Sequence, residues 1–170
     1  MKAFFALVCL SAVLHSTFAI ECKDLMSKKD EIMDCCKVPD IIAREHLPPC
    51  EQEHDGKGMM QKWPCVMQCV FERDGLMNGG QIDTDKLIAK AEAINDDFKD
   101  KAVQIAKQCV AHMEKGNGNG NGKGECSVAP IKLSMCLAKG YVEHCPADKW
   151  TSSEVCDKIK SGDCYPRGKQ

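Results

Sequence analysis

Apolar residues recur at helical spacing along much of this chain. Successive apolar positions three or four residues apart lie on one face of a helix with 3.6 residues per turn. The clearest stripe consists of Phe98, Ala102, Ile105, Ala106, Cys109, Val110 and Met113. We therefore predict an amphipathic helix over residues 98–113, with the side chain of Cys109 pointing inward.

A second amphipathic helix precedes this one. Asp83 or Thr84 is its predicted N-cap, because the side-chain oxygens of these residue types accept hydrogen bonds from the first turn of a helix. The apolar positions that mark the helix are Leu87, Ile88, Ala91 and Ile94.

Other segments also favour helices. One helix should begin with Pro64 at its first position, where the missing N–H costs nothing, and end around residues 74–75. Another runs from about Pro130 to Tyr141, and two short helices are expected over residues 25–36 and 39–46. No window alternates apolar and polar residues for long, so strands are not expected. The pattern predicts an all-α fold.

The first 19 residues form a separate segment. The cationic Lys2, an apolar run over residues 3–14 and the small residue Ala19 are typical of a secretory signal peptide cleaved after Ala19. The run is shorter than the roughly 20 apolar residues of a membrane span. We predict a secreted, extracellular protein without stable membrane insertion, in which residues 20–170 form one domain.

The mature chain is weakly acidic. Cleavage would leave 22 basic and 25 acidic residues, a formal charge of −3. Because no polybasic stripe stands out, nucleic acid and anionic membranes are not expected partners.

A glycine–asparagine repeat occupies residues 115–124. Such a sequence cannot bury apolar area, so we predict a flexible loop. It is either a mobile lid over a pocket or a tolerated surface insertion, and the insertion is favoured because loops generally tolerate added residues.

Twelve cysteines follow residue 20, and an even number in an exported chain indicates a disulfide framework. The adjacent Cys35 and Cys36 point to different sides and so can tie two partners. Cys65 and Cys69 lie one helical turn apart with parallel side-chain directions, so each should bond another segment. Residues 146–170 form a C-terminal extension that its cysteines should pin to the body; it either covers a cavity or packs on an outer face.

Motifs of catalysis are missing from the sequence. It contains no HExxH zinc motif, GxSxG elbow, glycine-rich phosphate loop or EF-hand spacing. The His–Asp pair that follows adjacent cysteines in secreted phospholipases is also missing, since Lys37, Val38, Pro39 and Asp40 follow Cys36. We predict a protein that is not an enzyme and that carries no cofactor or metal.

The cysteine spacing resembles that of the insect odorant-binding proteins (the pheromone and general odorant-binding family). Three residues between the second and third cysteines, and eight between the fifth and sixth, are the most diagnostic gaps. The segment 71–83 also looks like that family's link between its third and fourth helices. Cys126, Pro146 and Cys156 resemble additions of the Plus-C subgroup. The six matching cysteines are Cys36 (or Cys35), Cys65, Cys69, Cys109, Cys136 and Cys145.

This resemblance implies a compact, disulfide-crosslinked bundle of about six or more helices around an apolar cavity. In the family the first cysteine bonds the third, the second the fifth and the fourth the sixth. Carried over, this pattern gives Cys36–Cys69, Cys65–Cys136 and Cys109–Cys145. The other six cysteines allow 15 pairings, among which Cys126–Cys156 is our suggestion. These six are Cys22, Cys35, Cys50, Cys126, Cys156 and Cys164.

The function implied is that of a secreted carrier in olfaction, which binds small hydrophobic molecules in a helical cavity and transports them through aqueous fluid. A chemosensory receptor is a candidate partner, and monomer and homodimer both stay open, as does a pH trigger for release. For each pocket candidate taken singly, ordinary core packing is the favoured alternative, because apolar stripes usually form core. The candidates are Met67, Phe71, Leu76, Met77, Leu87, Ile88, Ala91, Ile94, Phe98, Ile105, Val110, Met113, Ile131, Met135 and Tyr141.

Two rival functions are kept. A carrier of the same fold could act outside olfaction, for example in saliva or hemolymph. A disulfide-rich binding or inhibitory protein could instead act on a macromolecule, in which case a filled core and an exposed apolar patch are expected.

Overall fold

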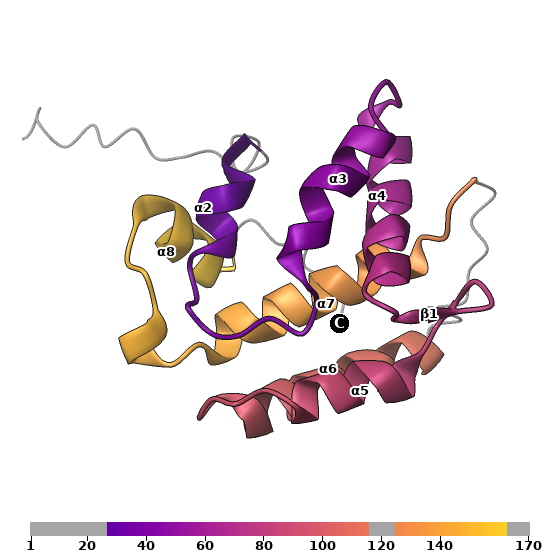
Figure 1. Ribbon diagram of the computed structural model, residues 1–170. Helices are drawn as coiled ribbons and strands as arrows, with labels where there is room; N and C mark the ends of the chain where they lie inside the picture. The colour runs from indigo at the N-terminus through magenta and orange to yellow at the C-terminus, as the bar shows by residue number, and fades with distance from the viewer. Residues whose placement is uncertain (1–26, 116–124, 163–170) are drawn as a thin grey trace, which may run out of the picture. The chain divides into compact units, whose positions relative to one another are not determined.

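The computed structural model describes residues 27–115 and 125–162 (Figure 1). The predicted signal peptide, nearly all of the glycine–asparagine repeat, and Cys22 and Cys164 lie outside the described residues. The chain divides into two compact units. The larger unit comprises residues 36–151, and the smaller comprises residues 1–35 with residues 152–170. Within the described ranges, no helix is long and apolar enough to cross a membrane.

Helices build the larger unit. In the described chain these are α3 (Leu47–Glu53), α4 (Met59–Arg73), α5 (Thr84–Glu92), α6 (Lys99–Lys115) and α7 (Ala129–His144), with short 3₁₀ turns η2 (Arg44–His46) and η3 (Ala147–Lys149). Helices α5 and α6 lie alongside one another, and α6 packs against α7 (Figure 1). Helix α4 contacts both α3 and α7. The all-α fold is confirmed.

The two helices with the strongest apolar stripes form as predicted. Asp83 is the N-cap of α5, and its side chain accepts a hydrogen bond of 3.1 Å from the backbone N–H of Lys86. Helix α6 buries Ala102, Ile105, Ala106 and Cys109, which are stripe residues. Helix α7 is also confirmed, with a proline in its first turn and with three residues beyond the predicted end.

The predicted start of α4 is wrong. This helix begins at Met59, so Pro64 lies inside it instead of at its first position. An interior proline removes one helical hydrogen bond, a cost that local preference alone would avoid. Tertiary packing overrides that preference here, because α4 buries Cys65, Val66 and other residues of one face. The predicted end is confirmed, since Asp74 is the C-cap and Gly75 has a φ of 71°.

The helix predicted over residues 39–46 is also wrong. Residues 37–43 contain no regular helix, and the helix forms later, as η2 followed by α3. Pro48 and Pro49 lie in the first turn of α3, where a missing N–H costs little. The helix expected over residues 25–36 is shorter in the described chain, where α2 spans Lys29–Met33.

Two very short strands were not expected. β1 (Met77–Asn78) pairs with β2 (Gln81–Ile82) in an antiparallel hairpin. The two residues that join them, Gly79 and Gly80, have φ angles of 58° and 80°. Positive φ at both loop positions is what a two-residue hairpin of this hand needs, and glycine adopts it without strain. The hairpin is too short to show a two-residue period in the sequence.

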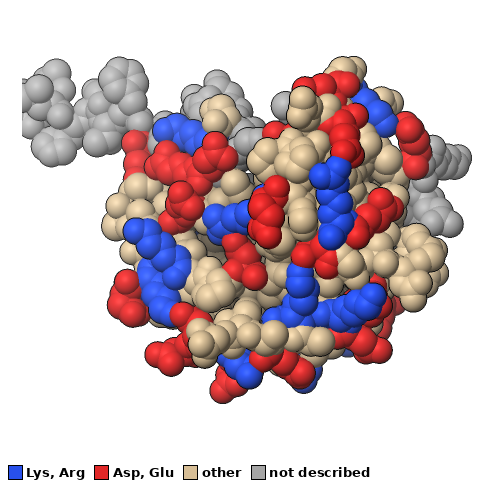
Figure 2. All heavy atoms as spheres, viewed as in Figure 1, with Lys and Arg blue, Asp and Glu red and all other residues tan. Residues whose placement is uncertain are grey.

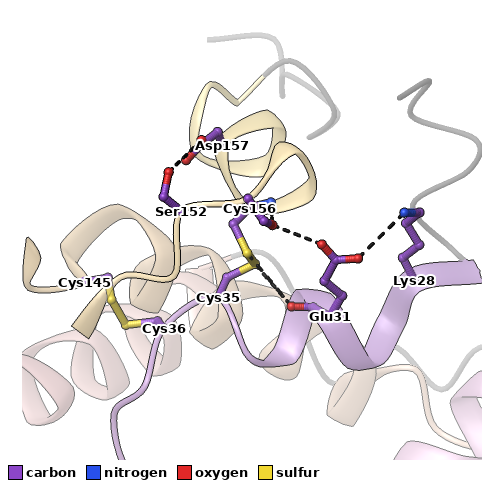
Figure 3. Close-up of a disulfide and its surroundings, with 9 residues drawn as sticks. Lys28, Glu31, Cys35, Cys36, Cys145, Ser152, Cys156 and Asp157 are labelled. Carbon is purple, nitrogen blue, oxygen red and sulfur yellow. Dashed lines mark hydrogen bonds and ion pairs between the residues drawn. A yellow bond between two sulfur atoms is a disulfide. The ribbon is translucent and has the colours of Figure 1, made fainter. Parts of the chain in front are cut away.

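Ten cysteines of the described chain form five disulfides: Cys35–Cys156, Cys36–Cys145, Cys50–Cys69, Cys65–Cys126 and Cys109–Cys136. The prediction that Cys65 and Cys69 each bond another segment is confirmed. The prediction that Cys35 and Cys36 tie two partners is confirmed as well (Figure 3).

The individual pairings predicted from the resemblance are wrong: Cys36–Cys69, Cys65–Cys136, Cys109–Cys145 and Cys126–Cys156 do not form. The bonding order is nevertheless the expected one, first to third, second to fifth and fourth to sixth. It applies to Cys50, Cys65, Cys69, Cys109, Cys126 and Cys136.

The error came from the choice of the six cysteines. Cys69 on α4 is bonded to Cys50 because α3 packs against α4, and Cys109 on α6 is bonded to Cys136 because α6 packs against α7. The gap of eight residues between Cys136 and Cys145 was assigned to the fifth and sixth cysteines of the family pattern. In the interlaced set the fifth and sixth cysteines are instead Cys126 and Cys136. Sequence spacing alone does not report which helices are neighbours.

The smaller unit contains α2 and α8 (Glu154–Lys160), joined by the Cys35–Cys156 disulfide (Figure 3). The side chain of Ser153 caps α8 by accepting a hydrogen bond of 3.2 Å from the backbone N–H of Cys156. The same hydroxyl donates to a carboxylate oxygen of Glu31 at 3.0 Å. The extension is therefore pinned by Cys156, as predicted, through a helix that the sequence analysis missed.

Helices α6 and α7 approach closely at Gly140. A Cβ atom at this position would lie 2.5 Å from Cγ2 of Ile105, a β-branched residue that is 2% exposed. Glycine is therefore needed in a helix interior, where it otherwise costs about 1 kcal/mol relative to alanine. The missing side chain lets the two helices meet.

We predict that Gly140→Ala lowers the free energy of unfolding by about 1–3 kcal/mol, because the added methyl overpacks against Ile105. In an Ile105→Ala background the clash is gone, and the same change should stabilise by about 0.5–1 kcal/mol through helix propensity. Urea denaturation of the four proteins measures both effects. An equal effect of Gly140→Ala in both backgrounds would contradict the packing argument.

We predict that a Cys35→Ser/Cys156→Ser variant loses amide-exchange protection in α8 while α6 keeps its own. Helices of 5 and 7 residues such as α2 and α8 are marginal without tertiary support. The crosslink supplies about 3 kcal/mol, because the Cys36–Cys145 disulfide already closes most of the loop between Cys35 and Cys156. Hydrogen–deuterium exchange resolves the two helices. Glu31→Gln is the control and should change exchange little, since the charge it removes forms only an exposed ion pair with Lys28 at 3.7 Å, worth about 0–1 kcal/mol. Unchanged protection in α8 of the double variant would sink the prediction.

Candidate functional site

Most of the predicted pocket residues lie in one buried apolar cluster of the larger unit. The cluster includes residues of α4, α5, α6 and α7 together with Val38 and Ile41 of the preceding segment. That these residues line a cavity stays a prediction. The predicted residues in or packed against the cluster are Met67, Phe71, Leu76, Met77, Leu87, Ala91, Ile94, Phe98, Ile105, Val110, Met113 and Tyr141.

Three predicted residues are not part of this cluster. Ile88 and Ile131 are only partly buried, and Met135 is 54% exposed. Met135 follows Ile131 by four residues on α7, so both lie on the same helix face. The prediction that Met135 lines an internal pocket is wrong, because its side chain is exposed. Helix α7 carries apolar residues on more than one face, so apolar character alone does not place a residue of this helix inside the molecule.

A surface groove of about 550 Å³ lies beside the cluster. Residues 40–45 form one side, and Lys90, Ala93 and Ile94 of α5 and its C-terminal end form the other. Ile94 is the one predicted pocket residue that lines it. Residues 40–45 were not among the predicted pocket residues, because this segment was expected to form a short helix and carries no motif of a functional face. The sequence marks this segment only indirectly. Two apolar residues, Ile41 and Ile42, follow shortly after Pro39, whose ring fixes its own backbone φ.

Polar contacts hold the segment 40–45 in place. Asp74, the C-cap of α4, accepts a hydrogen bond of 3.2 Å from the backbone N–H of Ala43 and forms an ion pair with Lys90. The side chain of Asp74 is only 6% exposed, so this contact is largely shielded from water. Arg44 forms an ion pair with Asp40, which lies four residues before it in the sequence. On the face shown in Figure 2, acidic and basic side chains intermingle, and neither sign forms a broad patch.

Tyr141 of α7 belongs to the buried cluster and does not itself line the groove. Its ring meets that of Phe98 edge to face, with centroids 5.2 Å apart and planes at 87°. The residue is 9% exposed, and its buried hydroxyl has no hydrogen-bond partner among the described residues. Burial raises the pKa of this phenol well above its usual range, and the negative charge of Asp40 adds to the rise. The backbone of Ile41 acts in the opposite direction but does not reach hydrogen-bond geometry.

An ion pair fixes the turn between α5 and α6. Both carboxylate oxygens of Asp96 lie 2.5 Å from Nζ of Lys149 in η3, and one accepts a 2.8 Å hydrogen bond from the backbone N–H of Phe98. The hydrogen bond from Lys149, together with that from Phe98, holds the pKa of Asp96 below its usual range. The contact thus anchors the turn that carries Ile94 and Phe98, two residues of the apolar cluster.

Comparison with known sequences shows to which family this chain belongs. A sequence profile of the PBP/GOBP family matches residues 23–140, which include all six interlaced cysteines. The chain belongs to the insect odorant-binding protein family. It is 30% identical over 155 residues to general odorant-binding protein 68 of Anopheles gambiae, covering 82% of this chain and 72% of that protein.

Membership in the odorant-binding family explains the bonding order. The matched segment ends before Cys145 and Cys156, so the two disulfides outside the interlaced set each use a cysteine beyond the match. Assignment to the Plus-C subgroup stays a prediction.

Within the described residues, no group of three or more His, Cys, Asp or Glu side chains is placed to hold a metal ion.

We predict that Asp96→Asn lowers the thermal midpoint at neutral pH, with a difference from wild type that shrinks as the pH falls. A carboxyl whose pKa is depressed by folding stabilises the protein above its unfolded pKa of 3.8, and this contribution is lost as the pH drops through the lower folded value. The asparagine still offers an oxygen to the N–H of Phe98, so only the charge is removed. Circular dichroism melts between pH 2.5 and pH 7 measure the effect.

The exposed neighbour Asp97 supplies the control. An Asp97→Asn variant removes the same charge without the contact to Lys149, and its melts should follow those of wild type much more closely. If the two variants show the same pH profile, the pair of Asp96 and Lys149 does not anchor the turn.

Proposed function

We propose that this member of the odorant-binding family is a secreted, non-enzymatic carrier that binds small hydrophobic molecules and transports them through extracellular fluid. The observation that carries the proposal is the interlaced set of three disulfides around a buried apolar cluster, in a chain whose sequence matches the family. A role in olfaction, with delivery to a chemosensory receptor, is the finer form of this proposal.

The groove beside the cluster is the proposed place of ligand binding. Its inner wall is apolar, because Ile41 and Ile94 are 4% and 8% exposed and belong to the cluster. Burying roughly 300 Å² of ligand surface at about 25 cal/mol per Å² gives about 7–8 kcal/mol, which corresponds to roughly micromolar affinity. Crosslinked helices can keep such a site from collapsing to ordinary packing density.

The test is uptake of the fluorescent probe N-phenyl-1-naphthylamine by the oxidised mature protein. We expect saturable binding with a dissociation constant of roughly micromolar, and displacement by neutral volatile hydrocarbons, ketones and aldehydes. Failure of a folded, fully disulfide-bonded sample to bind the probe would overturn the carrier function. The search would then turn to a macromolecular target, the rival kept from the sequence.

Two matched variants locate the site. Ala93 is exposed and lines the groove, so Ala93→Trp should occupy part of it without disturbing the core and weaken probe binding several-fold. Ala111 is equally exposed on α6 and does not line the groove, so Ala111→Trp should leave binding unchanged. Equal binding by both variants and wild type would place the ligand elsewhere in the molecule.

A further inference from the structure

The hydroxyl of Tyr141 is an exception to the way proteins treat buried polar groups. Such groups are nearly always hydrogen-bonded, because a buried group without a partner loses its hydrogen bonds to water and gains none in the protein. Here the residue is 91% buried, being 9% exposed, and its hydroxyl has no partner in the described chain. A phenylalanine would make the same edge-to-face contact with Phe98 without this cost. The hydroxyl therefore calls for an explanation beyond packing.

The position of the hydroxyl relates it to the groove. The groups that act on its ionisation are Asp40 and the backbone of Ile41, and both residues line the groove. The buried hydroxyl is therefore near Asp40 and Ile41, and Ile41 belongs to the same buried cluster as Tyr141. Ile94, which lines the opposite side, belongs to the same buried cluster as Tyr141.

The groove wall that residues 40 and 41 form is held by side chains more than by its backbone. Residues 38–42 form no backbone–backbone hydrogen bond with any other described residue. The segment is fixed at its two ends, by the Cys36–Cys145 disulfide and by the bond from the N–H of Ala43 to Asp74. A stretch without backbone hydrogen bonds of its own opens locally more readily than a helix does. A molecule in the groove would reach the hydroxyl by displacing the buried side chain of Ile41.

The chemistry of the hydroxyl restricts what it can bind. With its pKa raised by burial, the phenol keeps its proton at every physiological pH and acts as a donor. Burial also disfavours a charged partner, because a carboxylate would lose its hydration inside the apolar cluster. The complementary ligand group is a neutral acceptor, such as the carbonyl oxygen of a ketone, aldehyde or ester, attached to an apolar chain.

We propose that the Tyr141 hydroxyl donates a hydrogen bond to the ligand and thereby selects neutral carbonyl-bearing molecules over hydrocarbons of the same shape. This inference rests on the proposed carrier function and specifies its ligand class. The cluster supplies apolar contact that is nearly indifferent to ligand type, whereas the hydroxyl supplies one directional contact.

The test compares wild type with Tyr141→Phe, using displacement of N-phenyl-1-naphthylamine by two ligands of matched shape. These are 2-nonanone and 2-methyl-1-nonene, in which a methylene group replaces the carbonyl oxygen. We expect the variant to bind the ketone about three- to tenfold more weakly, the worth of one net hydrogen bond, and to bind the alkene with unchanged affinity. Sodium nonanoate should displace the probe less well than the ketone in wild type.

A control variant and a stability measurement separate ligand recognition from a structural role. The hydroxyl of Ser134, also on α7, already donates to the carbonyl of Pro130 at 2.9 Å, so Ser134→Ala should leave both ligand affinities unchanged. Without ligand, Tyr141→Phe should melt at the same temperature as wild type or higher, because it removes an unpartnered buried group.

The outcomes are distinct. Weaker binding of the ketone alone, with an undiminished melting temperature, supports the proposal. Equal changes for ketone and alkene, no change for either, or a lower melting temperature of Tyr141→Phe would overturn it while leaving the carrier function intact. If wild type fails to take up the probe, the carrier function fails and this proposal with it.

Discussion

The constraint on which the larger unit depends is the interlaced set of disulfides Cys50–Cys69, Cys65–Cys126 and Cys109–Cys136. Two of the three bonds leave α4 one helical turn apart, one to α3 and one to the segment before α7. The third joins α6 to α7. Each bond removes conformational freedom from the unfolded chain and so favours the packed arrangement. The helices they link enclose the apolar cluster.

With the helices held by these disulfides, a few glycines and two carboxylates complete the packing around the cluster. Gly140 allows α6 and α7 to approach closely, and the Gly79–Gly80 turn returns the chain so that Asp83 can cap α5. Two polar anchors then hold the parts of the cluster that are not helical. Asp96 binds Lys149 and fixes the turn that carries Ile94 and Phe98, whereas Asp74 binds Ala43 and Lys90 beside the groove. Both carboxylates act where helix packing alone leaves the backbone unsupported.

The groove and Tyr141 together describe a site of mixed character. The groove has an apolar wall and a charged rim, and the buried hydroxyl of Tyr141 has no hydrogen-bond partner within residues 27–115 and 125–162. A carrier of volatile molecules must bind many apolar shapes and still discriminate among them. Apolar burial provides affinity in proportion to area with little directional preference, so a single fixed donor can supply much of the discrimination.

The sequence by itself determined the helical class, α5, α6 and α7 and the divergent bonding of Cys35–Cys36 and Cys65–Cys69, because these follow from local periodicity and side-chain direction. It also indicated the family through its cysteines, although the six were chosen wrongly. Only the tertiary structure decided which cysteines pair, where α4 begins despite Pro64, and that residues 40–45 line a groove. These features depend on which segments become neighbours, and contacts between residues far apart in sequence leave no periodic trace in it.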